Sequence, residues 1–185
     1  MPRTIFSLCL LSLLSIAPTP VAGVQDQPIG LSAQESPVLF LVRHTERTDD
    51  VPGAPHEADP HLSEVGHERA ALLATMLKDA GLTHIHSSDY IRTRETAAPT
   101  AAETGIEMTL YDVDDIPGFA EQLKVQKGRH LVVGHSNTTW DLVEALGGDP
   151  GPPIESLEYD RLYMVIMGPA GVRTVLIRFG TPLVG

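Results

Sequence analysis

Apolar residues along this chain gather in short continuous runs between polar stretches. Val38–Val42 is wholly apolar, and His130–Val133 is a second, mostly apolar run. Runs of this length are typical of strands buried on both faces of a sheet. Further strands are predicted at Thr83–His86, Glu107–Tyr111, Arg161–Met167 and Val172–Phe179. The last two are joined by a Gly-Pro-Ala-Gly turn and would form an antiparallel hairpin at the edge of the sheet.

Longer amphipathic segments separate these strands. Ser63 is the predicted N-cap of the first helix, and Gly81 ends it. One apolar face of this helix is expected to hold Val65, Leu72, Leu73, Met76 and Leu77. Three more helices are predicted, from caps at Ser87 and Ser88 to about Thr104, from Asp114 and Asp115 to about Lys127, and from a cap at Ser136 or Asn137 to Leu146.

Strands and helices that alternate along a chain predict a three-layer α/β/α sandwich around a mostly parallel central sheet. In such sheets ligands bind beyond the carboxyl ends of the strands. The candidate site residues are therefore those that follow Val42, His86 and Val133.

The first residues have the pattern of a secretory signal peptide. Arg3 gives a positive start, Ile5–Ile16 is apolar, and small residues near Ala22 offer a cleavage site. A membrane anchor is the alternative, but the apolar run is shorter than the roughly 20 residues that span a bilayer. The chain is expected to comprise a signal peptide at 1–23, a flexible leader at 24–36 and one domain at 37–185. The mature protein would be periplasmic or secreted, with no stable membrane insertion.

Charge and cysteine content narrow the classes of function. The net charge is −11, and loss of residues 1–23 removes Arg3 alone among the charged residues, which gives −12. So acidic a protein lacks the basic surface that attracts nucleic acid or anionic lipid, so neither is expected as a partner. Cys9 is the only cysteine and lies in the signal segment, so the mature protein would have neither a disulfide nor a thiol nucleophile.

Arginines and histidines follow three of the predicted strands. Arg43 and His44 come directly after the first strand, and Arg92 lies in the first turn of the helix after the second. His135 follows another strand and precedes a helix N-terminus. Guanidinium groups and helix N-termini suit phosphate oxygens. Positive neighbours would keep an imidazole neutral near pH 7, which is the form that can attack phosphorus.

Four segments, in the same order along the chain, resemble motifs of the histidine phosphatase superfamily, which also contains the cofactor-dependent phosphoglycerate mutases. They read Leu-Val-Arg-His-Thr-Glu at 41–46, Leu-Ser-Glu-Val-Gly at 62–66, Ser-Ser-Asp-Tyr-Ile-Arg-Thr-Arg-Glu-Thr-Ala at 87–97 and Val-Val-Gly-His-Ser-Asn-Thr at 132–138. The chain looks like a small secreted bacterial member with a phosphoglycerate mutase-like fold. Its departure from the family signature is Thr45, where glycine is usual and a side chain is expected to narrow the pocket without abolishing the chemistry.

The resemblance implies that His44 forms a phosphohistidine, while Arg43, Arg92 and His135 hold the phosphoryl oxygens. The implied activity is that of a histidine acid phosphatase-type phosphomonoesterase acting on a small phosphate ester or a phosphoprotein. An inactive phosphoryl-binding protein on the same fold and a phosphomutase are the alternatives. All four pocket residues are present, which favours an enzyme. A mature domain of 162 residues leaves little room for the insertions of the mutases, which favours a phosphatase.

The family also places a carboxylic acid after the second arginine, to act as general acid. The first candidates here are Asp115 and Asp114, and Glu46, close to the nucleophile, is another. An aspartate ahead of a helix that starts with proline is equally an ordinary cap. Some small family members work without a dedicated acid.

No metal or cofactor is expected. Two arginines and a histidine offset the charge of a phosphate without a divalent ion. The other histidines lack the spacing of a metal motif and are interpreted as structural or surface residues: His56, His61, His67, His84 and His86. Tyr159 is interpreted as a packing residue. The loops Thr48–Pro60 and Gly147–Glu158 are expected to select the substrate.

Overall fold

The computed structural model describes residues 36–181, so the predicted signal peptide and nearly all of the predicted leader lie outside the described residues. In chain order the elements are β1 (Val38–Arg43), the 3₁₀ helix η1 (Thr48–Asp50), α1 (Glu64–Leu77), β2 (His84–Ser87), α2 (Ile91–Thr104), β3 (Met108–Leu110), α3 (Ile116–Val125), β4 (Arg129–Gly134), α4 (Ser136–Ala145), β5 (Arg161–Gly168) and β6 (Gly171–Arg178).

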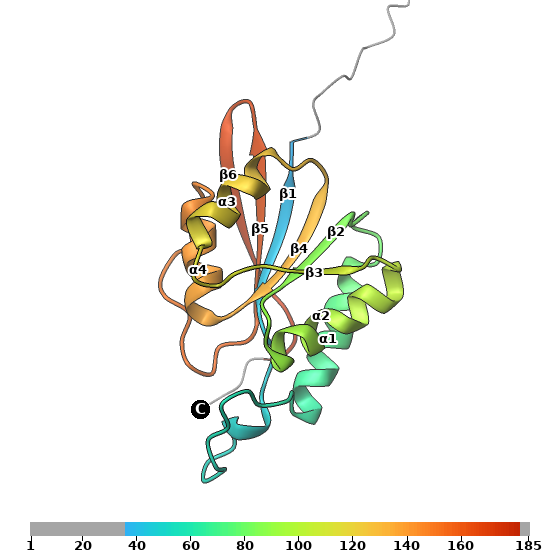
Figure 1. Ribbon diagram of the computed structural model, residues 1–185, viewed down its shortest axis with the longest axis vertical. Helices are drawn as coiled ribbons and strands as arrows, with labels where there is room; N and C mark the ends of the chain where they lie inside the picture. The colour runs from blue at the N-terminus through green and yellow to red at the C-terminus, as the bar shows by residue number, and fades with distance from the viewer. Residues whose placement is uncertain (1–35, 182–185) are drawn as a thin grey trace, which may run out of the picture. The chain divides into compact units, whose positions relative to one another are not determined.

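The strands form one sheet in the order β3-β2-β4-β1-β5-β6 (Figure 1). Strands β3, β2, β4 and β1 run parallel to their neighbours. Strand β5 pairs antiparallel with β1, and β6 pairs antiparallel with β5. The predicted central parallel sheet and the predicted hairpin at its edge are both confirmed.

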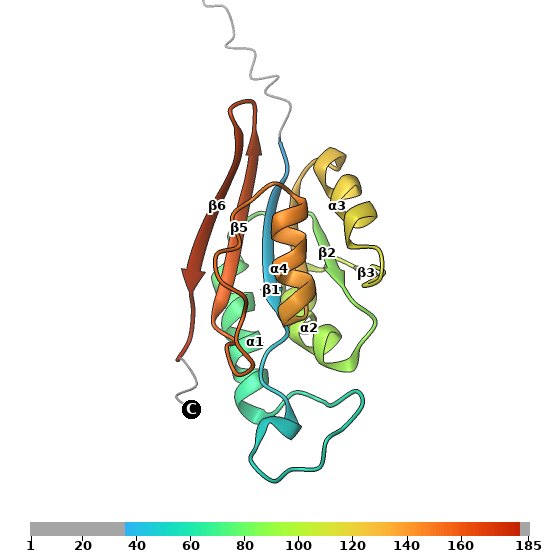
Figure 2. The same cartoon turned by 90° about the vertical axis from the view of Figure 1, so that its left-hand side faces the viewer.

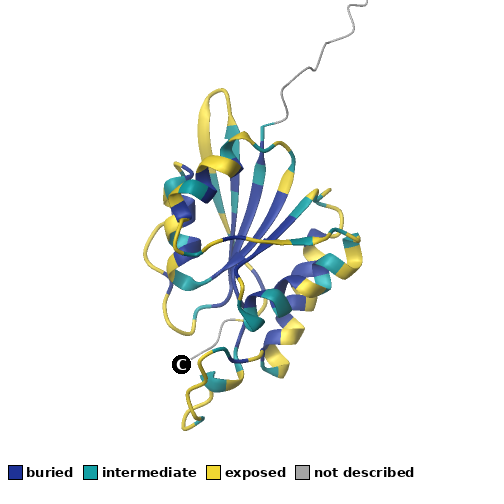
Figure 3. Ribbon diagram, viewed as in Figure 1, coloured by how far each residue is buried: buried dark blue, intermediate teal, exposed yellow. Residues whose placement is uncertain are grey.

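Side chains of the central strands alternate between two hydrophobic cores. Leu39 and Leu41 of β1 pack with residues of α3 and α4, whereas Phe40 and Val42 pack with residues of α1 and α2. The two helix pairs therefore cover opposite faces of the sheet (Figure 2), and the buried residues gather in the strands between them (Figure 3). This arrangement confirms the three-layer α/β/α sandwich. Between residues 36 and 181, no helix has the length and apolar character needed to cross a bilayer.

The buried face of α1 differs from the predicted one. Three of the predicted residues are exposed: Val65, Leu72 and Met76. The buried face holds Gly66, Arg69, Ala70, Leu73, Ala74 and Leu77. Arg69 is stable there because its guanidinium group binds the buried carboxylate of Glu46, with N–O distances down to 2.6 Å. A hydrophobicity pattern cannot anticipate a charged residue on the inner face.

The cap of α2 also differs from the prediction. Ser87 and Ser88 were expected to cap this helix, but the side-chain hydroxyls of both donate to other acceptors, and neither accepts from a backbone N–H of the first turn. The carboxylate of Asp59 does so instead, accepting from the backbone N–H of Ile91 at 3.0 and 3.1 Å. An acceptor from the loop before α1 thus satisfies a helix N-terminus about 30 residues later in the chain.

Candidate active site

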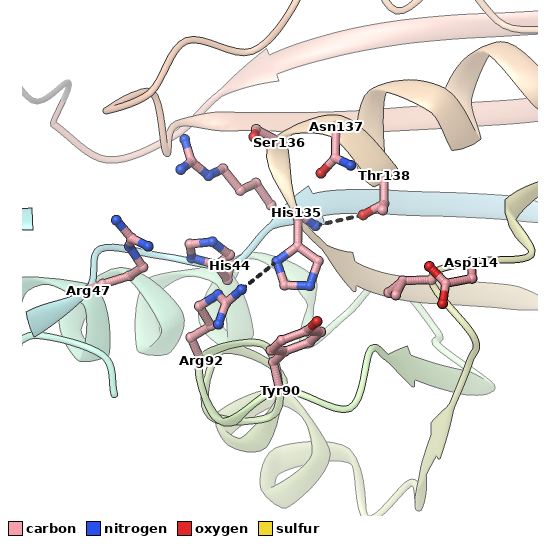
Figure 4. A pocket seen from close by; sticks show the side chains of 11 residues that line it. His44, Arg47, Tyr90, Arg92, Asp114, His135, Ser136, Asn137 and Thr138 are labelled. Atoms are coloured by element: carbon pink, nitrogen blue, oxygen red, sulfur yellow. Dashed lines mark hydrogen bonds between the residues drawn. The ribbon is translucent and has the colours of Figure 1, made fainter. Parts of the chain in front are cut away.

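A cavity of about 380 Å³ opens at the carboxyl ends of β1 and β4, beside the start of α2. All four residues predicted for the site line it: Arg43, His44, Arg92 and His135. Figure 4 labels the last three of them. These residues come from separate segments of the chain. They meet because parallel strands end at the same edge of the sheet, so that the residues that follow each strand lie side by side.

The imidazole of His44 is buried and oriented by its own backbone neighbour. Its Nδ1 lies 2.8 Å from the carbonyl oxygen of Thr45. A carbonyl only accepts, so Nδ1 carries the proton and Nε2 of the neutral ring carries the lone pair. Burial lowers the pKa of His44 to about 2, and the charge of Arg43 acts in the same direction. The cations predicted from the sequence contribute, but loss of hydration on burial is the larger cause of the neutral ring.

Thr45, the departure from the family signature, does not line the cavity. Its hydroxyl donates to the carbonyl oxygen of Gly66 at 2.8 Å, and its backbone N–H donates to the hydroxyl of Thr96 at 3.0 Å. The expectation of a narrowed pocket is therefore wrong. The side chain turns toward α1 and α2, where it fixes the backbone that follows His44.

Arg43 is held by the loop before β5. Its guanidinium group donates to the carbonyl oxygen of Glu155 at 2.9 Å and lies over the ring of Tyr159, 4.2 Å from the centroid. The Tyr159 hydroxyl donates in turn to the carboxylate of Asp50 at 2.7 Å. Tyr159 also lies 5.8 Å from the ring of His44, centroid to centroid. It was interpreted as a packing residue, and no local pattern could have linked it to an arginine 116 positions earlier.

Arg92 is held on three sides. It donates to the Asp59 carboxylate at 3.1 Å and to Nδ1 of His135 at 3.4 Å. Its guanidinium group also lies 4.4 Å from the ring centroid of Tyr90. These contacts direct the group into the cavity beside His44 (Figure 4).

His135 is the N-cap of α4, which begins at Ser136 and not behind a cap at Ser136 or Asn137 as predicted. The hydroxyl of Thr138 accepts from the backbone N–H of His135 at 2.9 Å. The three residues after His135 line the cavity, so the free N–H groups and positive dipole end of α4 lie beside it. The rings of His135 and His44 are 5.5 Å apart, and burial lowers the pKa of His135 to about 4.

The three candidate acids occupy different environments. Asp114 lines the cavity. Asp115 caps α3, where its carboxylate accepts from the backbone N–H of Gly118 at 3.0 Å. Glu46 is buried in its ion pair with Arg69. The structure therefore brings Asp114 to the site but not Asp115 or Glu46.

The two loops expected to select the substrate do not line the cavity. Within Thr48–Pro60, Asp59 binds Arg92, and within Gly147–Glu158, the carbonyl oxygen of Glu155 binds Arg43. Both loops therefore support the arginines from outside. Arg47, which sequence reasoning missed, lines the cavity and is paired with Asp50 at 2.9 Å.

The remaining histidines do not join the site. His84, His86 and His130 stack between β2, β4 and α3, with the rings of His84 and His130 4.5 Å apart. Among residues 36–181, no group of three histidine, cysteine or acidic side chains is placed to hold a metal ion.

Comparison with known proteins finds similarity to one family over part of the chain. The family model described as "Histidine phosphatase superfamily (branch 1)" matches residues 39–115. Two curated proteins named "Probable phosphoglycerate mutase GpmB", from Yersinia pestis (strain Pestoides F) and Yersinia pseudotuberculosis serotype O:1b (strain IP 31758), are 37% identical over 71 residues. These matches support a place in the histidine phosphatase superfamily. The match covers 38% of this chain and 33% of the mutases, so the chain spans about a third of the length of these relatives.

Solved structures of similar fold extend the likeness beyond residue 115. A mycobacterial glucosyl-3-phosphoglycerate phosphatase, Rv2419c, aligns with a TM-score of 0.59 and 16% identity over 77% of this chain and 97% of its own. The protein histidine phosphatase SixA, in complex with tungstate, aligns with a TM-score of 0.58 and 16% identity over 78% of this chain and 97% of its own. At such identities the likeness shows the fold alone, which these phosphatases share with this chain.

Proposed function

We propose that this protein is a phosphatase that hydrolyses phosphate monoesters through a phosphohistidine on His44. The observation that carries the proposal is the orientation of His44. The hydrogen bond from Nδ1 to the Thr45 carbonyl leaves Nε2 as an unprotonated nitrogen in a cavity that Arg43 and Arg92 also line. The low pKa of His44 keeps this nitrogen free to attack at neutral and mildly acidic pH.

The reaction proceeds in two displacements. Nε2 of His44 attacks phosphorus, and an N–P bond forms while the P–O bond to the alcohol breaks and the alcohol oxygen takes a proton. Water then attacks the same phosphorus and loses a proton, which restores the group that protonated the alcohol. The N–P bond breaks with its electron pair returning to Nε2, and inorganic phosphate leaves. Arg43 and Arg92 offset the charge of the transferred group in both steps. The N-terminus of α4 provides further positive potential at the same oxygens. His135, whose ring is neutral at pH 7, lines the cavity and accepts a hydrogen bond from Arg92.

Asp114 is the proposed proton donor to the leaving alcohol. Of the candidates Asp114, Asp115 and Glu46, only Asp114 lines the cavity. The carboxyl groups of Asp115 and Glu46 are occupied by a helix cap and by a buried ion pair. The substrate would be a small phosphate ester or a phosphoprotein, and the site of action the periplasm or the exterior.

Phosphate release from a panel of esters tests this proposal. The purified mature protein is assayed with sugar phosphates, nucleotides, a phosphopeptide and nitrophenyl phosphate. Wild type should release inorganic phosphate, and His44→Ala should be slower by about 10³-fold or more, as expected when a covalent nucleophile is removed. His67→Ala is the matched control, because His67 is an exposed histidine on α1. An inactive phosphoryl-binding protein would release no phosphate, and a mutase would transfer it to a second hydroxyl group.

A further inference from the structure

Asp59 lies between η1 and α1, yet its carboxylate binds the start of α2. It accepts from the backbone N–H of Ile91 and from the guanidinium group of Arg92, at 3.0 to 3.1 Å. The N-cap residue of α2, Tyr90, makes no capping hydrogen bond with its own side chain. One carboxylate thus accepts from a free backbone N–H at the start of α2 and also binds the arginine in the first turn of that helix.

This contact restricts the long side chain of Arg92. An arginine side chain has many rotamers and loses conformational entropy when it is fixed. In Arg92 that loss is borne on folding, because Asp59, Tyr90 and His135 already hold the guanidinium group. Binding of an anion then requires less ordering. Burial disfavours the charge of Arg92 by lowering its pKa, and the Asp59 carboxylate opposes that effect.

We propose that Asp59 is a positioning residue, which holds Arg92 in the orientation that binds the transferred phosphoryl group. The proposal rests on the phosphatase function proposed above only for the identity of the anion. It assigns the loop Thr48–Pro60 a role in preorganising the cavity, since Asp59 reaches Arg92 from outside the lining residues.

The alternative is that Asp59 is a helix cap and no more. Two variants separate these roles. Asp59→Ala removes both the cap and the contact with Arg92. Asp59→Asn retains an oxygen that can accept from Ile91, since asparagine caps helices about as well as aspartate, but it replaces the charged contact with Arg92 by a weaker neutral one.

Asp89→Ala is the matched control. Asp89 lies near the same end of α2 and carries the same charge, but it pairs with Arg94 and is exposed. An exposed ion pair contributes little to stability. Any effect of a negative charge near the helix dipole is therefore shared by Asp59 and Asp89, whereas the contact with Arg92 belongs to Asp59 alone.

The experiment measures the affinity for tungstate and for inorganic phosphate by titration calorimetry. Each variant is measured twice, once with Arg92 present and once with Arg92→Met in the same protein. We expect Asp59→Ala to weaken binding about tenfold, Asp59→Asn about threefold, and Asp89→Ala less than twofold, in line with the energies of charged and exposed contacts. In the Arg92→Met background both Asp59 variants should have no further effect, because Asp59 acts through Arg92.

Two results would overturn the proposal. One is unchanged anion affinity in both Asp59 variants. The other is an equal loss of affinity with and without Arg92, which would assign Asp59 to folding alone. Should Asp59→Ala not fold, Asp59→Asn decides the question by the same comparison. Anion binding is read without turnover, so a protein that hydrolyses no ester would refute the proposed function and still report the coupling of Asp59 with Arg92.

Discussion

At the scale of single residues, hydrogen bonds decide which side chains can react. Asp114 and Asp115 are neighbours in the chain, but the carboxylate of Asp115 is engaged by the backbone N–H of Gly118 and that of Asp114 lies at the cavity. Identical side chains therefore have different proposed roles, one as a proton donor and one as a helix cap.

Substitution of these two aspartates tests the assignment. An alkyl alcohol needs a proton as it leaves, and a positioned acid contributes about 10²–10⁴-fold, whereas nitrophenolate leaves readily without one. Asp114→Asn should therefore slow alkyl phosphates by about that factor and nitrophenyl phosphate only mildly. Asp115→Asn should change neither rate by more than about twofold, because asparagine preserves the cap. Equal small effects of both variants on the alkyl ester would assign the proton to water.

The two arginines and two histidines predicted for the cavity were predictable because each follows a strand or opens a helix. Arg43, His44 and His135 directly follow apolar runs, so their place at one edge of the sheet follows from the fold class. Asp59 and Tyr159 were not predictable as site residues. They reach Arg92 and Arg43 across 33 and 116 positions of the chain, and such contacts leave no local pattern.

At the scale of elements, α1 packs directly against the segment that follows the nucleophile. A Cβ atom at Gly66 would lie 2.1 Å from the carbonyl oxygen of Glu46. The helix can approach this closely only because Gly66 has no side chain. The exposed apolar residues of α1 were misassigned because the true inner face contains this glycine and the paired Arg69.

Gly66→Ala is expected to destabilise the fold. In an exposed helix this change would stabilise by about 1 kcal/mol, because glycine is the weaker helix former. Here the methyl group collides with backbone, so we expect a loss of about 1–3 kcal/mol in the free energy of unfolding, as for other overpacked sites. Urea denaturation measures this loss. Ala71→Gly, at an exposed position of α1, is the control, and there the glycine should be the less stable residue, as in an ordinary helix. Unchanged or increased stability of Gly66→Ala would contradict the close packing.

At the scale of the whole molecule, buried histidines link folding to pH. The Nε2 atom of His130 donates to the carbonyl oxygen of Gln126 at 3.0 Å, so its Nδ1 accepts from Nε2 of His86 at 3.1 Å. A proton added to Nδ1 of His130 would break this chain of hydrogen bonds. Burial, with the neighbouring histidines, lowers the pKa of His86 to about 4.

Stability should therefore fall on the acid side. Between about pH 6.5 and pH 4 the unfolded chain binds a proton at His86 that the folded protein does not, so the contribution is complete above pH 6.5 and is lost as the pH falls. Its size is on the order of a few kcal/mol. Urea unfolding at pH 7 and pH 4.5 should show this loss in the free energy of unfolding. The loss should be smaller in His86→Leu, whereas His67→Gln should lose as much as wild type. Equal stability of the wild type at both pH values would refute neutral buried histidines.

The architecture of the sheet was predictable from its apolar runs, including the hairpin of β5 and β6. The starts of α2 and α4 were not, because their caps come from Asp59 and His135, which serve the cavity at the same time. Sequence rules for caps assume a side chain that serves the helix alone. The errors therefore fall where structural and chemical roles share one residue.

The most direct test of the phosphatase mechanism is to trap the phosphorylated protein. Wild type is mixed with ³²P-labelled substrate and quenched within milliseconds in alkali, and the label is located by peptide mapping. A phosphohistidine should appear at His44, stable in alkali and lost in acid, with turnover-dependent decay and no label in His44→Ala. Label on any other residue would contradict His44 as the nucleophile. A His44→Ala variant that keeps a tenth of the wild-type rate of hydrolysis would contradict it as well.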